Sequence, residues 1–348
     1  MDRPRTPPDP GFVDRPATVA VRAPGRLHLG FLDPAGSLGR RFGSVGLVIG
    51  GFETQVEISA SPVDQLTAAG PAEQAEVGRA ADCLRLLREH SACCDPLHLR
   101  LAQVLPAHAG LGSGTQLALA IGRAFALWHG LSLATPTLAQ WLGRGLRSGV
   151  GVAGFDHGGL IVDGGPGADG APAAVLSRLP LPEAWRVLVV QDSARMGLSG
   201  DEERQRLASL APLPQALAAD ICHQVLMRVL PGAAGADFVP FAMGVNRIQQ
   251  VLGEHFAPAQ GGHAFTSLAV GDVLRWLARH PAGAAAAIGQ SSWGPTGFAI
   301  LPSQEEAQAA IAAVRAAGIV APSLALRIVS GRNTGATLVD ARHAVPRP

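Results

Sequence analysis

The sequence Pro106-Ala107-His108-Ala109-Gly110-Leu111-Gly112-Ser113-Gly114-Thr115-Gln116 is followed at once by an apolar run from Leu117 to Trp128. Glycines at alternate positions make a poor strand, because glycine loses more backbone freedom on ordering than any other residue. In the run that follows, Leu117, Ile121 and Phe125 recur at helical spacing and fall on one face. The stretch therefore predicts a glycine-rich loop that opens an α-helix.

A loop of this kind is a candidate anion site. The start of a helix presents unpaired backbone N–H groups and the positive end of the helix dipole, and glycines keep side chains out of the way. The loop is neither a Walker A sequence nor a dinucleotide fingerprint after a strand. The alternative is a glycine turn that only precedes a core helix. As a phosphate or diphosphate site it would use Gly110, Leu111, Gly112, Ser113, Gly114, Thr115 and Gln116.

The pattern P-x-x-x-G-L-G-S-G within this loop resembles the phosphate-binding loop of the GHMP kinase superfamily. Two further segments resemble the first and third motifs of that superfamily, namely Ala23 to Phe31 and Gly289 to Ile300. The resemblance implies an α+β, two-domain GHMP kinase-like fold. Its N-terminal domain would resemble ribosomal protein S5, and its C-terminal domain would be ferredoxin-like.

Within the superfamily, R-L-H-L-G-F at residues 26–31 and G-S-L-G-R-R-F-G-S-V-G-L at residues 36–47 resemble the β-ribofuranosylaminobenzene 5'-phosphate synthases. That resemblance implies decarboxylating phosphoribosyl transfer in tetrahydromethanopterin biosynthesis. The substrates would be phosphoribosyl pyrophosphate and 4-aminobenzoate or 4-hydroxybenzoate. The products would be a β-ribofuranosyl-arene 5'-phosphate, CO2 and pyrophosphate, with Mg2+ accompanying the diphosphate.

A kinase is the second hypothesis. Residues 116–155 contain no Asp or Glu, although GHMP kinases typically place a magnesium-binding Glu there. When Val152-Ala153 and Gly158-Gly159 are matched to the homoserine-kinase-like pattern D-N-V-A-x-x-x-x-G-G, the Asp position falls on Val150. ATP would be a substrate only of such a kinase. A non-catalytic nucleotide-binding relative is the third hypothesis.

Composition limits the partners. The 348 residues suffice for two domains, and 47% hydrophobic with 16% charged residues fits a soluble globular protein. A formal net charge of +1 gives no reason to expect nucleic acid or a membrane surface as a partner. The partners expected are small-molecule substrates, and a homodimer is possible.

Residue usage bears on chemistry and location. Lysine is absent, which excludes a Schiff-base lysine and leaves phosphate recognition to arginine, backbone and helix ends. The four cysteines lack C-x-x-C spacing and are interpreted as reduced thiols. The start of the chain has no signal-peptide core and no stretch is apolar over 18 residues, so the predicted location is cytoplasmic.

The predicted organisation is a disordered arm at residues 1–17, an N-terminal phosphate-loop domain at 18–180 and a C-terminal domain at 181–348. Strands are expected at residues 18–22, 44–49, 54–59, 97–104, 186–191, 325–329 and 336–339. Helices are expected at 76–90, 117–128, 135–146, 200–210, 216–230, 237–252 and 305–317. Residues 147–165 are expected to form a second glycine-rich turn that leads into a strand.

Candidate catalytic residues are Arg26, His28 and Asp156. Arg26 and His28 alternate along a predicted strand and so share a face, where Arg26 would hold an anion and His28 would donate to the aromatic substituent. Asp156 and Asp163 are candidate metal or ribose-hydroxyl ligands, although either carboxylate alternatively caps a turn.

The remaining candidates bind anions or substrate. Arg40 and Arg41 lie in a glycine-bordered loop and are candidate phosphate ligands. Candidate substrate-binding residues are Ser44, Glu203, Trp293, Gly294 and Arg332. Trp293 would stack on an aryl ring, or is an ordinary buried tryptophan. Arg332 would reach the site or merely close a hairpin, and the acids around Glu203 would alternatively belong to a helix cap.

Overall fold

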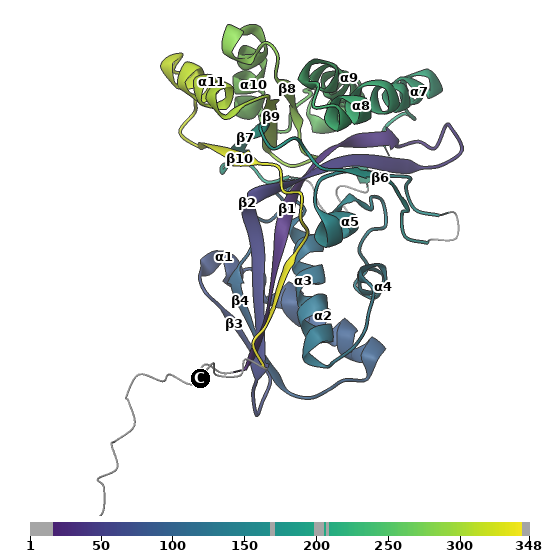
Figure 1. Cartoon of the computed structure of the whole chain (residues 1–348), viewed down its shortest axis with the longest axis vertical. Helices are drawn as coiled ribbons and strands as arrows, with labels where there is room; N and C mark the ends of the chain where they lie inside the picture. Colours follow the sequence, from purple (N-terminus) through teal and green to yellow (C-terminus); the bar gives the residue numbers. More distant parts are fainter. Residues whose placement is uncertain (1–16, 168–170, 198–204, 207–208, 343–348) are drawn as a thin grey trace, which may run out of the picture.

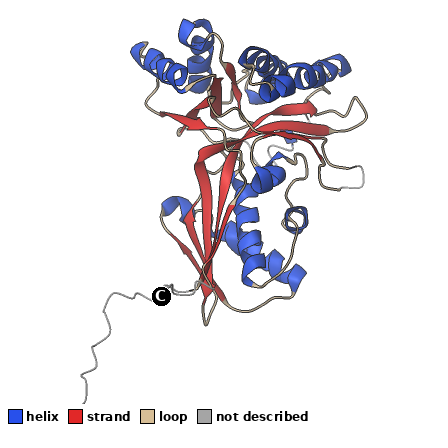
Figure 2. Cartoon of the chain, in the orientation of Figure 1, coloured by secondary structure: helices blue, strands red, loops and turns tan. Residues whose placement is uncertain are grey.

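The computed structural model describes residues 17–167, 171–197, 205–206 and 209–342, and its strands form two sheets (Figures 1 and 2). The arm expected before residue 18 and most of the helix expected at 200–210 lie outside the described residues. The mixture of sheets and covering helices confirms the predicted α+β class.

The first sheet has the strand order β11-β1-β2-β4-β3, with β5 paired to β2 and β6 paired to β5. Its strands are β1 (Thr18–Asp33), β2 (Phe42–Ala60), β3 (Gln65–Ala68), β4 (Leu97–Gln103), β5 (Leu160–Asp163), β6 (Val175–Leu179) and β11 (Thr337–Asp340). β1 and β2 pair along their length as one antiparallel hairpin, from Thr18 opposite Ser59 to Asp33 opposite Phe42. Register shifts next to Arg26 and His28 mark bulges, which bend a strand and redirect its side chains.

The sequence prediction was wrong to divide β2 into two strands at its glycines. Gly51 has φ +74°, and a Cβ there would lie 3.0 Å from a methyl group of Val329. Glycine therefore permits an irregular backbone and close contact with a strand of the second sheet without ending the strand.

The described residues of the first half form the helices α1 (Pro71–Gln74), α2 (Val77–Ser91), α3 (Ser113–Trp128), α4 (Thr135–Trp141) and α5 (Val150–His157). α3 confirms the helix predicted after the glycine-rich loop, and its buried residues Leu117, Ile121 and Phe125 lie in one core with α2 and β4. α4 is shorter than predicted, and positive φ at Gly143 and Gly145 follows its end.

Residues 150–157 form a helix, so the glycine-rich turn predicted there was wrong, whereas β5 (Leu160–Asp163) confirms the strand that the turn was expected to lead into. The glycines of α5 permit close packing instead of breaking the helix. A Cβ on Gly154 would lie 2.7 Å from Val48 Cγ2, and one on Gly151 would lie 3.1 Å from Thr115 Cγ2. Tertiary contact with α3 and β2 thus overrides the low helix propensity of glycine.

The second sheet is antiparallel, with the order β10-β7-β9-β8. Its strands are β7 (Arg186–Asp192), β8 (Ala287–Gln290), β9 (Thr296–Leu301) and β10 (Leu324–Ser330). The helical segments of this half are α7 (Gln215–Gln224), the π-helical η1 (Val225–Val229), α8 (Leu230–Ala234), α9 (Phe238–Phe256), the short 3-10 turns η2 (Ala257–Gln260) and η3 (Pro281–Gly283), α10 (Leu268–Arg279) and α11 (Gln304–Ala316). α9 and α11 confirm predicted helices, whereas α10 was not predicted.

The two halves share a core. Leu27 and Leu29 of β1 pack in one buried cluster with Val187 of β7 and Ile248 of α9. At Gly30 a Cβ would lie 2.6 Å from Leu252 Cδ1, so glycine is what lets α9 approach β1. The predicted boundary near residue 180 falls between β6 and β7, while β11 returns from the end of the chain to pair with β1.

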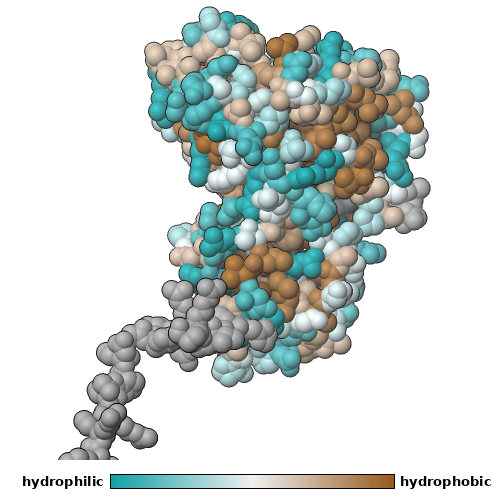
Figure 3. Space-filling model, viewed as in Figure 1, coloured by the Kyte–Doolittle hydropathy of each residue, from teal (hydrophilic) through white to brown (hydrophobic). Residues whose placement is uncertain are grey.

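The surface seen in Figure 3 mixes polar and apolar residues, with one apolar patch at the upper right and another on the lower part of the molecule. Exposed large apolar side chains include Leu226, Met227, Val239 and Met243. None of the helices in the described ranges has the length and apolar character needed to cross a membrane.

Candidate active site

The glycine-rich loop ends at the first turn of α3, and several of its backbone N–H groups have no hydrogen-bond partner among the described residues. Gly110 and Gly112 have φ +83° and +80°, a region that favours glycine. The N–H groups of residues 110–114 donate to no other residue in the described part of the chain, whereas those of Thr115 and Gln116 bond Gly112 O at 3.1 and 3.0 Å. This geometry suits a bound oxyanion at the positive end of α3.

Two segments distant in sequence hold the loop at the carbonyl of Gly110. Arg26 Nη1 donates to Gly110 O at 2.8 Å, and Ser291 Oγ donates to the same oxygen at 2.6 Å. Ser291 Oγ in turn accepts from the backbone N–H of His28 at 2.9 Å. The first strand, the glycine-rich loop and the turn between β8 and β9 therefore meet around one polar centre.

The close approach of these segments explains their glycines. A Cβ on Gly294 would lie 2.3 Å from Gly110 N, and one on Gly110 would lie 2.3 Å from Ser291 O. Gly197 N donates to His108 O at 2.9 Å, which brings the segment after β7 to the same place. Gly294 thus acts as a packing partner of the loop, and its backbone borders the anion site.

Arginines surround the loop. A Cβ on Gly112 would lie 3.2 Å from Arg26 Nε, and one on Gly114 would lie 3.6 Å from Arg144 Nη1. Arg79 Nη2 lies 2.8 Å from His108 Nε2. Sequence reasoning missed Arg79 and Arg144, because they come from α2 and from the segment after α4 and belong to no motif. The absence of lysine was the signal that arginines must assemble here.

His28 is buried, with 4% of its surface exposed, on the side of β1 that faces the second half. Burial, and secondarily the charge of Arg26, lower its pKa from 6.5 to about 3. The imidazole is therefore neutral at physiological pH. Its Nε2 is buried and has no hydrogen-bond partner among the described residues.

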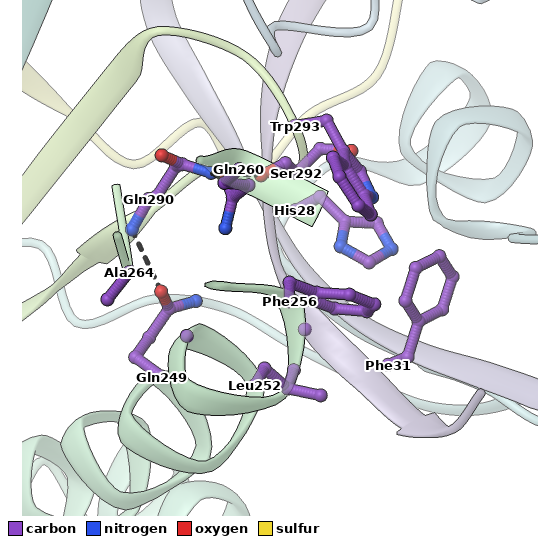
Figure 4. A pocket seen from close by; sticks show the side chains of 12 residues that line it. His28, Phe31, Gln249, Leu252, Phe256, Gln260, Ala264, Gln290, Ser292 and Trp293 are labelled. Carbon is purple, nitrogen blue, oxygen red and sulfur yellow. Dashed lines mark hydrogen bonds between the residues drawn. The ribbon is translucent and has the colours of Figure 1, made fainter. Parts of the chain in front are cut away.

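His28 lines a pocket together with the aromatic rings of Phe31, Phe256 and Trp293, and three glutamines complete much of its polar lining (Figure 4). Its ring packs edge-on against Phe31 with centroids 4.6 Å apart, and the centroids of the Phe256 and Trp293 rings lie 5.0 Å apart. Other residues that line it are Gly30, Gln249, Leu252, Gly253, Gln260, Ala264, Gln290 and Ser292. Phe256 follows from no sequence motif, whereas Phe31 ends the R-L-H-L-G-F segment.

Asp163, a candidate metal ligand, lies buried at the start of α5. Its Oδ2 accepts from Gly149 N at 2.9 Å and from Ser148 Oγ at 3.3 Å, and its Oδ1 accepts from Gly165 N at 2.8 Å. Burial raises its pKa although these hydrogen bonds act in the opposite direction. These contacts support the alternative that Asp163 holds a turn.

Asp156 is exposed near the end of α5 and accepts from Thr135 Oγ1 at 2.6 Å. Thr135 also accepts from Arg123 Nη2 at 2.7 Å. Asp156 lines a separate pocket between α4 and α5 and has no contact with His28 or Gly110. The structure therefore does not bring it together with the other two candidate catalytic residues.

The candidate anion ligands Arg40 and Arg41 are exposed near the tip of the β1–β2 hairpin. Arg41 lies over the ring of Phe42 with 5.0 Å to its centroid. Ser44 is buried on β2, opposite Phe31 on one side and Asp163 on the other, and its hydroxyl has no partner among the described residues. None of the three contacts the glycine-rich loop.

The guanidinium of Arg332 makes hydrogen bonds and an ion pair within the protein. It bonds Thr334 O at 3.1 Å and Gly335 O at 2.8 Å and pairs with Glu53. Gln116 is likewise turned inward, since its Nε2 donates to Gly151 O at 2.8 Å. Glu203 lies outside the described residues.

A protein-held Mg2+ does not fit the described part of this site. Magnesium prefers carboxylate oxygens, yet residues 96–155, which include the whole glycine-rich loop, carry no Asp or Glu. No group of three or more His, Cys, Asp or Glu side chains suited to a metal occurs among the described residues.

Comparison with known proteins agrees with this architecture. Residues 77–159 match the GHMP kinases N terminal domain family, and residues 244–320 match the GHMP kinases C terminal family. A β-ribofuranosylphenol 5'-phosphate synthase of Archaeoglobus fulgidus is 34% identical over 297 residues, covering 82% of this chain and 88% of the relative. The enzyme of that name from Methanothermobacter thermautotrophicus is 32% identical over 247 residues, covering 66% of this chain and 75% of the relative.

Solved structures with the same fold include kinases of small molecules and mevalonate diphosphate decarboxylases. Homoserine kinase from Cytophaga hutchinsonii superposes with a TM-score of 0.67 at 17% identity, over 95% of this chain and 100% of the kinase. Phosphomevalonate kinase from Streptococcus pneumoniae superposes with a TM-score of 0.66 at 12% identity, over 91% and 100%. The predicted GHMP kinase-like fold is confirmed.

Proposed function

The chain belongs to the β-ribofuranosylphenol 5'-phosphate synthase family of the GHMP kinase superfamily, and we propose that it transfers a phosphoribosyl group to a 4-substituted benzoate with loss of CO2. The donor is phosphoribosyl pyrophosphate, and the acceptor is 4-hydroxybenzoate or 4-aminobenzoate. The observation that carries this proposal is the hydrogen-bonded contact of Ser291 with both Gly110 and His28, which joins an anion cradle to an aromatic pocket.

The reaction balances without a redox partner. The C1–O bond of the donor breaks, and its electron pair leaves with pyrophosphate. The ring carbon that bears the carboxylate attacks C1 and forms a C–C bond. The bond from that carbon to the carboxylate then breaks, its electron pair restores the aromatic ring, and CO2 departs.

The residues of the site suit both substrates of this reaction, the phosphoribosyl donor and the aromatic acceptor. Charge develops on the leaving diphosphate, and preorganised N–H groups at residues 110–114 with Arg26 and Arg144 would stabilise it there. The ribose 5'-phosphate is a second anion for the same arginines. The pocket beside His28 would hold the ring in place for attack, which replaces a bimolecular encounter by an oriented one.

Mg2+ in this proposal enters with the diphosphate and not in a protein cage. The resident groups near the loop in the described ranges are arginines and N–H donors, which complement the oxygens of a diphosphate but not a bare cation. The metal would neutralise part of the leaving charge. The cytoplasmic location, the tetrahydromethanopterin pathway and the homodimer stay predictions.

Phosphoryl transfer is disfavoured at the position where a kinase needs its catalytic Asp. Val150 is fully buried and packs with Val48, Ala153 and Ile161. An apolar core side chain cannot accept a proton from an alcohol.

The test is incubation with phosphoribosyl pyrophosphate and carboxyl-labelled 4-hydroxybenzoate or 4-aminobenzoate. We expect labelled CO2 and pyrophosphate in equal amounts. Arg26→Ala should depress both, whereas the control Arg85→Ala, which removes an exposed pair with Glu89, should not. ADP formation from ATP and an alcohol, without CO2 release, would contradict the proposal.

A further inference from the structure

Ser291 connects the second half of the molecule to the glycine-rich loop. It lies directly after β8 and is fully buried. Its Oγ donates to Gly110 O at 2.6 Å and accepts from the backbone N–H of His28 at 2.9 Å. A carbonyl oxygen can only accept and a backbone N–H can only donate, so the side chain at this position must do both. A hydroxyl group meets that requirement, which fixes the direction of both hydrogen bonds.

Gly110 O receives a second donor from the first strand. Arg26 Nη1 donates to it at 2.8 Å, and the backbone N–H of Arg26 donates to the next carbonyl, Leu111 O, at 3.1 Å. Two consecutive carbonyls of the loop are therefore held by groups outside the loop. The first is held by Arg26 and Ser291 together, and the second by Arg26.

These contacts also set the direction of two N–H groups. In a trans peptide unit the carbonyl oxygen and the N–H point in opposite directions. Holding the carbonyls of residues 110 and 111 toward β1 and Ser291 therefore aims the N–H groups of Leu111 and Gly112 to the opposite side. Neither N–H has a hydrogen-bond partner in the part of the chain that the structure describes. Both belong to the donors that the proposed function assigns to the diphosphate.

The loop needs such restraints because its glycines supply few of their own. Gly110 and Gly112 have φ +83° and +80°, and glycine populates positive and negative φ almost equally. Rotation of the peptide between Gly110 and Leu111 would place a carbonyl oxygen where an N–H now lies. That oxygen would repel a diphosphate instead of binding it.

We propose that Ser291 is a positioning residue of the anion site. From the second half of the molecule it holds the peptide between Gly110 and Leu111, so that the Leu111 N–H is directed at the leaving diphosphate. Ser291 does not touch the substrate and takes no part in bond exchange. The inference rests on the proposed function, and it makes the diphosphate site depend on both halves of the molecule.

The experiment measures pyrophosphate binding by calorimetry to the full chain and to two variants. Ser291→Ala removes the hydroxyl, whereas Ser291→Cys keeps a weak donor of similar size. Binding of 4-hydroxybenzoate, the free energy of unfolding in urea and release of labelled CO2 are measured in parallel.

The matched control is Ser267→Ala. Ser267 is also buried in the second half, and its Oγ likewise makes two hydrogen bonds, donating to Asp192 Oδ2 at 2.6 Å and accepting from Val270 N at 3.2 Å. It caps α10 and makes no hydrogen bond to the glycine-rich loop within the described ranges. The control therefore carries a similar structural loss without the proposed positioning role.

We expect Ser291→Ala to weaken pyrophosphate binding by roughly five- to twentyfold, because the Leu111 N–H donates to a charged oxygen while Arg26 still restrains the same peptide. Ser291→Cys should lose less. Both alanine variants should lower the free energy of unfolding, but Ser267→Ala should bind pyrophosphate as wild type does. Binding of 4-hydroxybenzoate should change by less than about twofold in every variant.

Unchanged pyrophosphate binding in Ser291→Ala, or equal weakening in Ser267→Ala, would overturn the positioning role. Equal losses for pyrophosphate and 4-hydroxybenzoate would also overturn it, because they would indicate a general loosening between the two halves. If Ser291→Ala does not fold, Ser291→Cys decides by the same comparison.

The two proposals fail separately. Selective loss of pyrophosphate binding in Ser291→Ala, without CO2 release by the wild type, would overturn ribosyl transfer and keep the positioning role. Release of CO2 by the wild type, with normal pyrophosphate binding in Ser291→Ala, would do the reverse.

Discussion

Two helices begin side by side in this protein, and their first turns are used in opposite ways. α3 and α5 touch where Gln116 Nε2 donates to Gly151 O at 2.8 Å. The start of α5 is satisfied from within, since Asp163 and Ser148 accept from Gly149 N and Val150 N. The N–H groups that lead into α3 have no such partner among the described residues.

The difference separates a structural helix start from a binding one. Both helix starts offer the positive end of a helix dipole. At α5 the carboxylate of Asp163 accepts from the backbone, whereas the side chains near the start of α3 include the arginines Arg26 and Arg144. We therefore propose that an external anion binds at the start of α3 and not at the start of α5.

The largest effect should come from removing the internal anion of α5. Asp163→Ala leaves the N–H groups of Gly149 and Gly165 buried without an acceptor. We expect a loss of about 3 kcal/mol or more in the free energy of unfolding, measured by urea denaturation. Asp163→Asn should lose less, because it keeps one acceptor oxygen. Undiminished stability of Asp163→Ala would remove the capping role.

The next effect tests the open end of α3. Gly112→Val places a branched side chain against Arg26 at a residue with φ +80°. We expect pyrophosphate affinity to fall by roughly a hundredfold or more through blocked approach and backbone strain. Calorimetry with pyrophosphate measures this, with circular dichroism to verify folding.

Gly130→Val is the matched control, because Gly130 has φ +67° with nothing within 4 Å of a Cβ. It carries similar strain without obstructing the loop. If both variants bind pyrophosphate as wild type does, the glycine-rich loop is not the anion site.

Arg26 should have a somewhat smaller effect. Loss of a charge-assisted contact with substrate costs about 1.5 to 3 kcal/mol, or roughly ten- to a hundredfold in kcat/KM. Arg26→Lys should be impaired and Arg26→Ala more so, because an ammonium cannot replace a planar guanidinium that also bonds Gly110 O. Normal kinetics in a folded Arg26→Ala would make this arginine purely structural.

The neutral His28 beside the cradle predicts a pH effect. Its folded pKa of about 3 lies below the unfolded value of 6.5, so the unfolded chain binds the extra proton between these values. The contribution of neutral His28 to the free energy of unfolding is therefore fully present above pH 6.5. It is lost as the pH falls toward 3, by up to about 1.4 kcal/mol per pH unit. His28→Gln should show a shallower acid-side loss in denaturation between pH 7 and 4.5. Parallel curves for the two proteins would show that His28 titrates normally.

The smallest expected effect is that of ATP. With Val150 in the core at the position of the kinase Asp, ATP with Mg2+ and homoserine, sugar or mevalonate-type alcohols should give no ADP above background. Saturable ADP production with any of these alcohols would contradict the proposed ribosyl transfer in favour of a kinase.

The helix α3 and the loop before it were predictable from the sequence. Alternate glycines followed by apolar residues at helical spacing predicted α3 and its loop, since these are properties of neighbouring residues. The same reasoning failed at α5, where glycines at 151 and 154 suggested a turn. Their role is to allow contact with Thr115 and Val48, which no local pattern contains.

By itself the sequence determined the glycine-rich loop, the helix after it and the pairing of Arg26 and His28 on one strand. Only the tertiary structure decided that Ser291, 181 residues away, bonds Gly110, that Arg144 lies over α3, and that Phe256 completes the pocket around His28. It also turned Asp163 and Arg332 from candidate ligands into groups with internal partners. The physical reason is that helix formation follows from near neighbours, whereas a binding site depends on which distant backbone groups are left without partners after the chain has packed.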